Sequence, residues 1–260
     1  MTALIHPTAV IHPQAELADD VRVGPYSVVG ANVKLDQGCQ LDSHVVIEGY
    51  SQIGPNNRFF PFSCIGAEPQ DKKYRNEPTE LRIGKGNTFR ENVTVNTGTV
   101  QDIGYTQIGD HNWIMAGVHI AHDCVVGNNT IFANAVALAG HVKVDDWAIL
   151  GGYTLVHQFC HIGAHAFCGM GSVINQDVPN YVVVSGNIAK PHGINSEGLK
   201  RRGFNEAQIG LIKKAYRVLY RKELKLAQAV AEMMQMNDAQ GTLDALIAFL
   251  NQDHHSGIIR

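Results

Sequence analysis

Histidine, aspartate and glycine residues recur at eighteen-residue intervals in the middle of this 260-residue chain. Gly140 and His141 follow His122 and Asp123 by eighteen positions, and Gln158 follows Gly140 by eighteen more. A neutral imidazole can accept a hydroxyl proton, a carboxylate can orient the ring, and a backbone N–H can stabilise an oxyanion. If the fold stacks these positions in a column, the sequence favours acyl transfer by general-base catalysis, without a covalent nucleophile.

A repeat of six residues would stack them in this way. Large apolar residues occupy every sixth position over 5–65, 83–95 and 108–174, with a slip of one residue across 96–107. A strict period of six fits a short strand plus a corner, and three such units form a triangular coil of about 18 residues. Because one unit cannot bury its apolar side chain alone, the coils must stack. The sequence therefore predicts a mainly β fold, a parallel β-helix.

Two polar segments interrupt the repeat, and a different pattern follows it. The segments 67–82 and 96–107 are expected to form loops that project from the scaffold, where functional residues are common. After residue 179 the hexads stop. Apolar residues then take helical spacing over three segments, 205–222, 224–236 and 242–252. We therefore expect a β-helix over residues 1–190 and a C-terminal helical domain over residues 191–260.

The composition is that of a globular protein, with 45% apolar residues and a net charge of −3. The N-terminus has no basic region followed by an apolar stretch, and no later stretch approaches the roughly 18 apolar residues of a membrane span. Five cysteines without CxxC spacing argue against a disulfide framework, and Cys124 is expected to be a small core residue. We expect a cytoplasmic protein with no membrane span and no nucleic-acid partner.

Positive charge is concentrated near the C-terminus. Residues 200–225 hold nine basic side chains, against only Glu206 and Glu223. Such a segment could dock an acidic partner or phosphate groups. A solvated helix face would have the same composition, so the charge alone leaves both interpretations open.

The thirteen histidines also raise the possibility of a zinc site. Some β-helix proteins resemble the gamma class of carbonic anhydrases, whose ligands include paired histidines five residues apart. No such pair occurs here, since His119 and His122 are three residues apart and His157, His161 and His165 are four apart. We therefore expect neither a metal centre nor a cofactor.

Four motifs resemble the UDP-N-acetylglucosamine O-acyltransferase family, which opens lipid A biosynthesis in Gram-negative bacteria. They are HIAHDC (119–124), AGHV (139–142), VHQFCHIGAH (156–165) and NSEGLKRRGF (195–204), and QDKKY, EPT and the closing GIIR agree as well. The resemblance covers essentially the full chain. It implies the left-handed form of the parallel β-helix and a homotrimer whose active sites lie between adjacent prisms.

The resemblance also implies roles for individual residues. His122 would be the general base that takes the proton from the glucosamine 3-hydroxyl, with Asp123 as its partner and Gly140 as the oxyanion donor. A first group would position the sugar nucleotide and a second would contact the nucleotide and the carrier: Asp71, Lys73, His119, His141, His157 and Gln158, then Asn195, Glu197, Arg201 and Arg202. The donor would be an acyl carrier protein with a 3-hydroxyacyl chain, an acidic partner suited to the basic segment.

Two positions bear on specificity. Met170 occupies the position of the family's hydrocarbon ruler, where members that use longer acyl chains tend to have glycine. Its side chain fills the space of about three or four methylenes, which predicts a short 3-hydroxyacyl chain near ten carbons. Many relatives carry a His-Arg pair where this chain has Asn96 and Thr97, so a contact by that pair is not carried over.

Two other functions stay open. The same base would serve a 3-amino acceptor, so an N-acyltransferase or an acetyl-CoA-dependent transferase of the same fold is the nearest alternative. The later N-acyltransferase of the lipid A pathway usually carries an additional N-terminal domain, whereas the hexads here begin at Ile5. A non-catalytic β-helix scaffold is the second alternative. It would need no grouping of His122, Asp123 and Gly140.

Overall fold

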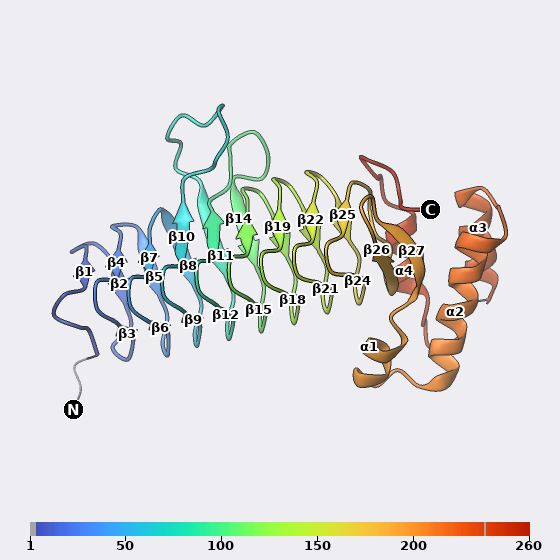
Figure 1. Cartoon of the computed structure of the whole chain (residues 1–260), viewed down its shortest axis with the longest axis horizontal. Helices are drawn as coiled ribbons and strands as arrows, with labels where there is room; N and C mark the ends of the chain where they lie inside the picture. Colours follow the sequence, from blue (N-terminus) through green and yellow to red (C-terminus); the bar gives the residue numbers. More distant parts are fainter. Residues whose placement is uncertain (1–3, 237) are drawn as a thin grey trace.

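The computed structural model describes residues 4–236 and 238–260. It is a long three-sided prism of stacked coils, with a group of helices packed at its C-terminal end (Figure 1). The polypeptide winds from the N-terminal end of the prism towards these helices, and its C-terminus returns beside the last coils (Figure 1). No helix in the described ranges is both long and apolar enough to cross a membrane.

In the described residues, three sheets form the sides of the prism, and their strands are parallel except for the last pair of the third sheet. The first sheet contains β1 (Val10–Ile11), β4 (Val28–Val29), β7 (Val46–Ile47), β10 (Cys64–Ala67), β13 (Thr94–Asn96), β16 (His119–Ile120), β19 (Ala137–Leu138), β22 (Leu155–Val156) and β25 (Val173–Ile174). The second contains β2 (Glu16–Leu17), β5 (Val33–Leu35), β8 (Tyr50–Ile53), β11 (Glu80–Ile83), β14 (Tyr105–Ile108), β17 (Val125–Val126), β20 (Lys143–Val144) and β23 (His161–Ile162). The third contains β3 (Arg22–Val23), β6 (Gln40–Leu41), β9 (Arg58–Phe59), β12 (Thr88–Phe89), β15 (Trp113–Ile114), β18 (Ile131–Phe132), β21 (Ile149–Leu150), β24 (Phe167–Cys168), β26 (Val182–Ser185) and β27 (Lys190–Ile194).

The hexad residues form the core, as predicted. Ile47, Ile65 and Leu138 are fully buried, and Phe59 stacks on Phe89 with ring centroids 4.8 Å apart. At the N-terminal end of the described residues, Ile5 is 43% exposed. Each coil buries its apolar residue only against its neighbours, so the stability of the prism comes from stacking.

Corners connect the three sheets. The first corner joins the first and second sheets, the second corner joins the second and third, and the third corner returns to the first. Many corners contain a residue in the left-handed region, for example Asp123, His141 and Phe159 with φ of 58°, 64° and 66°. Because successive coils share this geometry, their corner side chains form outward-facing columns.

Both predicted loops leave the prism at the first corner. One connects β10 to β11 and the other connects β13 to β14, and they project from the same edge (Figure 1). The regular pairing resumes earlier than the hexad pattern indicated, since Glu80 already pairs with Tyr105. The loops are therefore shorter than the predicted 67–82 and 96–107. They flank the coils that carry His122.

The C-terminal part begins with a hairpin, because β27 pairs antiparallel with β26. Four helices follow: α1 (Ser196–Arg201), α2 (Glu206–Arg221), α3 (Leu226–Met236) and α4 (Asp244–Leu250). Asn205 caps α2 through a capping box with Gln208. A second apolar cluster, which includes Leu199, Leu219 and Phe249, holds the helices together. The predicted helical segments match α2 to α4, whereas α1 was not predicted.

Candidate active site

His122 and Asp123 lie at the first corner, between β16 and β17. The parallel register pairs His119 with Ala137 and Ile120 with Leu138, so the next coil places its own corner directly alongside. Gly140 and His141 occupy that corner, and His157 and Gln158 follow one coil further on. The eighteen-residue column predicted from the sequence is therefore present.

Asp123 is the buried anchor of this group, with no exposed side-chain area. It accepts hydrogen bonds from the N–H and the hydroxyl of Thr99, at 2.9 and 2.6 Å, and its Oδ2 lies 2.8 Å from His122 Nδ1. Burial alone would raise the pKa of Asp123, but the hydrogen bonds from His122 and Thr99 outweigh it and lower the pKa below its ordinary value. The carboxyl group is therefore ionised at neutral pH.

His122 is held in the tautomer that a general base requires. An ionised carboxylate can only accept, so His122 Nδ1 donates to Asp123, and in the neutral ring it is Nε2 that carries the lone pair. The side chain is 14% exposed, which leaves it open to solvent. An imidazole in this state can take a proton from a hydroxyl group placed within hydrogen-bond reach.

Gly140 lies against the ring of His122. A Cβ at this position would come within 2.5 Å of His122 Cε1 and 2.7 Å of Nε2, so only glycine leaves the ring in place. The backbone hydrogen bonds between the described coils do not use Gly140 N–H. Ala139 N–H donates to the carbonyl of Val156, and His141 N–H donates to the carbonyl of His122. In the part of the chain that the structure describes, nothing accepts a hydrogen bond from Gly140 N–H. This donor is free beside the candidate base.

His141 belongs to the same group and lies on the next coil towards the C-terminus. Its ring meets the His122 ring edge-on at 5.0 Å, and its Nδ1 donates to Asp102 at 2.6 Å. His119 lies in β16, just before His122 on the same coil, with Nδ1 2.8 Å from Thr94 Oγ1. Burial, and to a smaller degree the neighbouring His122, lowers the pKa of His119. His119 is therefore neutral in the physiological range.

Thr99 and Asp102 were missed by the sequence analysis. Both come from the second loop, which begins one coil below His122 and leaves the prism at the same corner. The slip in the hexad phase across 96–107 was the available signal, because it located an insertion next to the coil of His122. The spacing gave no register for residues inside that insertion, so their contacts could not be derived.

Asn96 and Thr97 are buried at the base of the first loop. Asn96 donates from Nδ2 to the carbonyl of Glu68 at 2.9 Å, and Thr97 Oγ1 accepts from the hydroxyl of Thr79 at 3.2 Å. The pair therefore fastens the first loop to the prism. That loop carries Asp71, whose carboxylate accepts from the backbone N–H of Lys73 at 2.9 Å.

The predicted carrier and nucleotide contacts lie elsewhere. Asn195 caps α1 and donates to the carbonyl of His165 at the second corner, at 3.0 Å. The guanidinium of Arg202 lies 4.8 Å from the ring centroid of Trp147 at that same corner. Burial, followed by the nearby Arg201, lowers the pKa of Arg202. Within one chain these residues are not brought to the His122 group.

The other two predicted positions also lie away from His122. Glu197 is on α1 and pairs with Lys200 at 3.1 Å. Met170 is at the third corner and is 80% exposed. The predicted site residues therefore divide over all three corners of a single prism.

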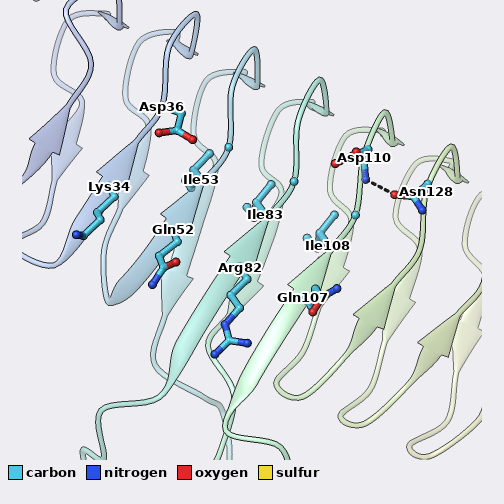
Figure 2. Close-up of a pocket in the computed structure, with 13 residues that line it drawn as sticks. Lys34, Asp36, Gln52, Ile53, Arg82, Ile83, Gln107, Ile108, Asp110 and Asn128 are labelled. Carbon is cyan, nitrogen blue, oxygen red and sulfur yellow. Dashed lines mark hydrogen bonds between the residues drawn. The ribbon is translucent and has the colours of Figure 1, made fainter.

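A separate groove lies along the outer face of the second sheet. Figure 2 shows Lys34, Gln52, Arg82 and Gln107 projecting from successive strands, with Asp110 at the nearby corner. Its charges are of both signs, and it contains none of the His122 group. The presence of a groove alone therefore does not identify the candidate active site.

The His122 group contains three residues of types that bind metals. Ligand atoms of His122, Asp123 and His141 all lie within 4.8 Å of one another. Both histidine Nδ1 atoms, however, donate to carboxylates, and Asp123 also accepts twice from Thr99. This satisfied hydrogen-bond network suits proton transfer better than metal binding. Cys124 is no nucleophile, because burial raises the pKa of its thiol to about 12.

A parallel β-helix of hexads with a histidine–aspartate pair at one corner defines the class of hexapeptide-repeat acyltransferases. Residues 105–140 match the bacterial transferase hexapeptide family model, and residues 177–259 match the model of UDP-N-acetylglucosamine O-acyltransferase domain 2. The chain belongs to the UDP-N-acetylglucosamine O-acyltransferase family. These matches confirm the resemblance stated from the motifs.

Individual relatives cover the chain almost completely. A Thiobacillus denitrificans protein named acyl-(acyl-carrier-protein)–UDP-N-acetylglucosamine O-acyltransferase is 53% identical over 99% of this chain and 100% of its own length. The solved structure of LpxA from Acinetobacter baumannii superposes with a TM-score of 0.94 at 42% identity, covering 99% of this chain and 100% of that one. An Arabidopsis UDP-N-acetylglucosamine acyltransferase has a TM-score of 0.84 at 34% identity, covering 99% and 100%. The left-handed parallel β-helix is thereby confirmed, and the protein is an acyltransferase.

Proposed function

We propose that this protein transfers a 3-hydroxyacyl chain from acyl carrier protein to the 3-hydroxyl of UDP-N-acetylglucosamine, the first step of lipid A biosynthesis. The observation that carries the proposal is the state of His122. Its Nδ1 is held by an ionised Asp123, its Nε2 is free, and it lies beside the unused N–H of Gly140. The names of the relatives supply the two substrates.

The chemistry follows from these three groups. His122 Nε2 takes the proton of the sugar hydroxyl as its oxygen attacks the thioester carbonyl of the carrier. Gly140 N–H stabilises the oxyanion of the tetrahedral intermediate, and Asp123 stabilises the imidazolium that forms. Collapse of the intermediate breaks the carbon–sulfur bond, and the imidazolium returns its proton to the thiolate that leaves. The proposed reaction has no acyl-enzyme intermediate and uses no metal or cofactor.

The remaining first-corner residues are proposed to bind the sugar nucleotide. His119 lies on the coil of His122, His141 on the next coil, and His157 and Gln158 on the coil after that, while the loop with Asp71 and Lys73 projects from the same edge. Asn195, Glu197, Arg201 and Arg202 lie elsewhere in the same chain. They are proposed to act on the active site of a neighbouring copy.

Exposed apolar side chains support a homotrimer. The outward residues Val10, Val28 and Leu155 of the first sheet are 61%, 39% and 49% exposed. The second sheet instead presents polar residues such as Lys34 and Gln52. Exposed apolar residues on one face favour an interaction surface, and three prisms packed side by side would cover them. Such packing would complete each site with residues from two chains.

The basic segment is proposed to dock the carrier. Lys213, Arg217, Arg221 and Lys222 line a pocket together with His192, between β27 and α2. An acidic carrier would be attracted to this surface, which should weaken binding as salt concentration rises. The substrates imply that the reaction takes place in the cytoplasm.

Met170 is proposed to limit the acyl chain to about ten carbons, because its side chain fills the space of three or four methylenes. The test incubates the protein with UDP-N-acetylglucosamine and carriers bearing 3-hydroxyacyl chains of different length, and weighs the products. A 3-O-acyl product with a preference near ten carbons is expected, and Met170→Gly should lengthen that preference. An unchanged preference would refute the ruler, and acylation of only a 3-amino analogue would refute the proposed acceptor.

A further inference from the structure

A column of rings continues from His122 to the C-terminal tail. His122 meets His141 edge-on at 5.0 Å, and His141 stacks on Phe159 at 4.4 Å with an interplanar angle of 10°. Phe159 in turn stacks on His255 at 4.8 Å and 27°. Two rings cannot stack on the same face of one phenyl group, so Phe159 lies between His141 and His255.

His255 comes from a part of the chain remote in sequence from the corner. The eighteen-residue register that supplies His141 and Phe159 ends after this coil. Ile162 pairs with Val178 sixteen residues later, whereas Val144 pairs with Ile162 after eighteen. The following corner is thus two residues shorter, and the tail passes beside it. His255 supplies the ring that the coils no longer provide.

The tail is fastened to the last coils beside His255. Asp177 exchanges backbone hydrogen bonds with Gly257 and Ile259, both at 2.9 Å. Its carboxylate accepts from His254 Nδ1 at 2.5 Å and from the backbone N–H of His161 at 2.7 Å. The side chains of His254 and Asp177 are 7% and 4% exposed. The backbone on either side of His255 is therefore fixed.

The far end of the tail is fastened to the helices. Ile259 is 2% exposed and belongs to the core of the prism. Its carbonyl accepts from the Tyr220 hydroxyl at 3.0 Å, and Arg260 donates to the carbonyls of Leu219 and Leu224. The tail therefore has defined contacts at both of its ends, and it connects the helices to the prism next to the active site.

We propose that His255 is a positioning residue for the active site. It closes the exposed end of the ring column, holds Phe159 against His141, and so fixes the rings beside His122 that would face the acceptor. Phe159 is 38% exposed even with His255 in place, and without this ring it could swing away from His141. His141 would then keep its contacts with Asp102, Asp123 and His122 but lose the ring stacked on it. The inference rests on the proposed function, since it assigns the acceptor to the His122 corner.

The test compares three variants in acyl transfer, with kcat and KM measured separately for the sugar nucleotide and for the carrier. His255→Ala should raise the KM for UDP-N-acetylglucosamine about two- to tenfold, the range of one aromatic contact. The KM for the carrier should stay within twofold of the wild-type value. His255→Phe keeps a ring and should retain the wild-type KM. Asp253→Ala, an exposed change in the same tail, should also match the wild type.

A double variant separates positioning from a general loss of structure. In a Phe159→Ala background, His255→Ala should add less than a twofold change, because the column is already broken. A wild-type KM for His255→Ala, equal impairment of His255→Phe, or fully additive effects would each overturn the proposal. If the wild-type protein fails to acylate UDP-N-acetylglucosamine, the proposed function fails instead. The ring-current shift of the His141 Cε1 proton, compared between wild type and His255→Ala, then still tests the column.

Discussion

The first and second corners of the prism each carry a histidine at the same backbone position, but the two side chains differ in their hydrogen-bond partners. His141 and His165 have φ of 64° and 58°, and both stack with aromatic rings of adjacent coils. His141 Nδ1 donates to Asp102 and lies 3.9 Å from Asp123. His165 Nδ1 is buried without a hydrogen-bond partner among the described residues.

The two environments give the two corners different chemistry. Burial, with Arg202 as a smaller cause, lowers the pKa of His165 to about 4. This ring stays neutral in the physiological range and acts as packing between Trp147 and Tyr181. At the first corner, carboxylates orient the rings of His122 and His141. The hexad backbone is common to both corners, so the neighbouring side chains decide which one can transfer protons.

The largest effect on the rate is expected from removing the proposed base, His122. His122→Ala should lower kcat about 10³-fold, within the range of general-base catalysis. His111→Asn is the matched control, because His111 is exposed and occupies the left-handed position of the second corner. Its steady-state rate should equal that of the wild type. An unimpaired His122→Ala enzyme would support the non-catalytic interpretation of the corner.

Removal of the charge on Asp123 should have the next largest effect. Asp123→Asn keeps a residue that tolerates positive φ, but it no longer holds His122 in the required tautomer. We expect kcat to fall about 10²-fold. Because the folded pKa of Asp123 is lowered, the carboxylate stabilises the fold above its ordinary pKa, and that stabilisation is lost as the pH falls through the folded pKa. The stability difference between wild type and variant in urea unfolding should therefore shrink in acid.

Glycine at the first corner can be compared with glycine at the third. Gly140→Ala should lower kcat about tenfold or more, since the new Cβ would push the His122 ring from its place. Gly152 is the equivalent residue of the third corner, and its Cβ would meet only the carbonyl oxygen of Asn134 at 3.3 Å. Gly152→Ala should keep wild-type kcat. Equal loss in both variants would show that any corner methyl disturbs the prism.

The smallest effect is expected on stability, at the second corner. The folded pKa of His165 lies near 4, below its ordinary 6.5, so the unfolded chain binds more protons between these pH values. The free energy of unfolding of the wild type should therefore fall as the pH drops through this window. His165→Asn should remove on the order of 1 kcal/mol of that dependence at pH 5, after allowance for partial exposure. Identical pH dependence in both proteins would contradict this contrast.

Much of this arrangement could be predicted from the hexads, because each period fixes one inward residue and each coil fixes one vertical step. That arithmetic placed His122 beside Gly140 and Asp123 beside His141. It could not place Thr99 and Asp102, whose loop has no period. It also gave no contact for His255, since a tail that returns to the prism leaves no repeat in the sequence.

The second-corner residues show another limit. Asn195 and Arg202 were expected at the active site, yet within one chain they pack against His165 and Trp147. Sequence motifs identify residues that belong to a family's site without telling which copy of the chain supplies them. The structure of one chain brings His122, Gly140 and His141 together, whereas Asn195 and Arg202 lie at the second corner.

The most direct test is the single-turnover rate of His122→Ala with UDP-N-acetylglucosamine already bound and 3-hydroxydecanoyl carrier added in excess. We expect the variant to bind the sugar nucleotide within about threefold of the wild-type Kd, while the transfer step slows about 10³-fold. Transfer at the wild-type rate in this bound complex would contradict the claim that His122 is the base.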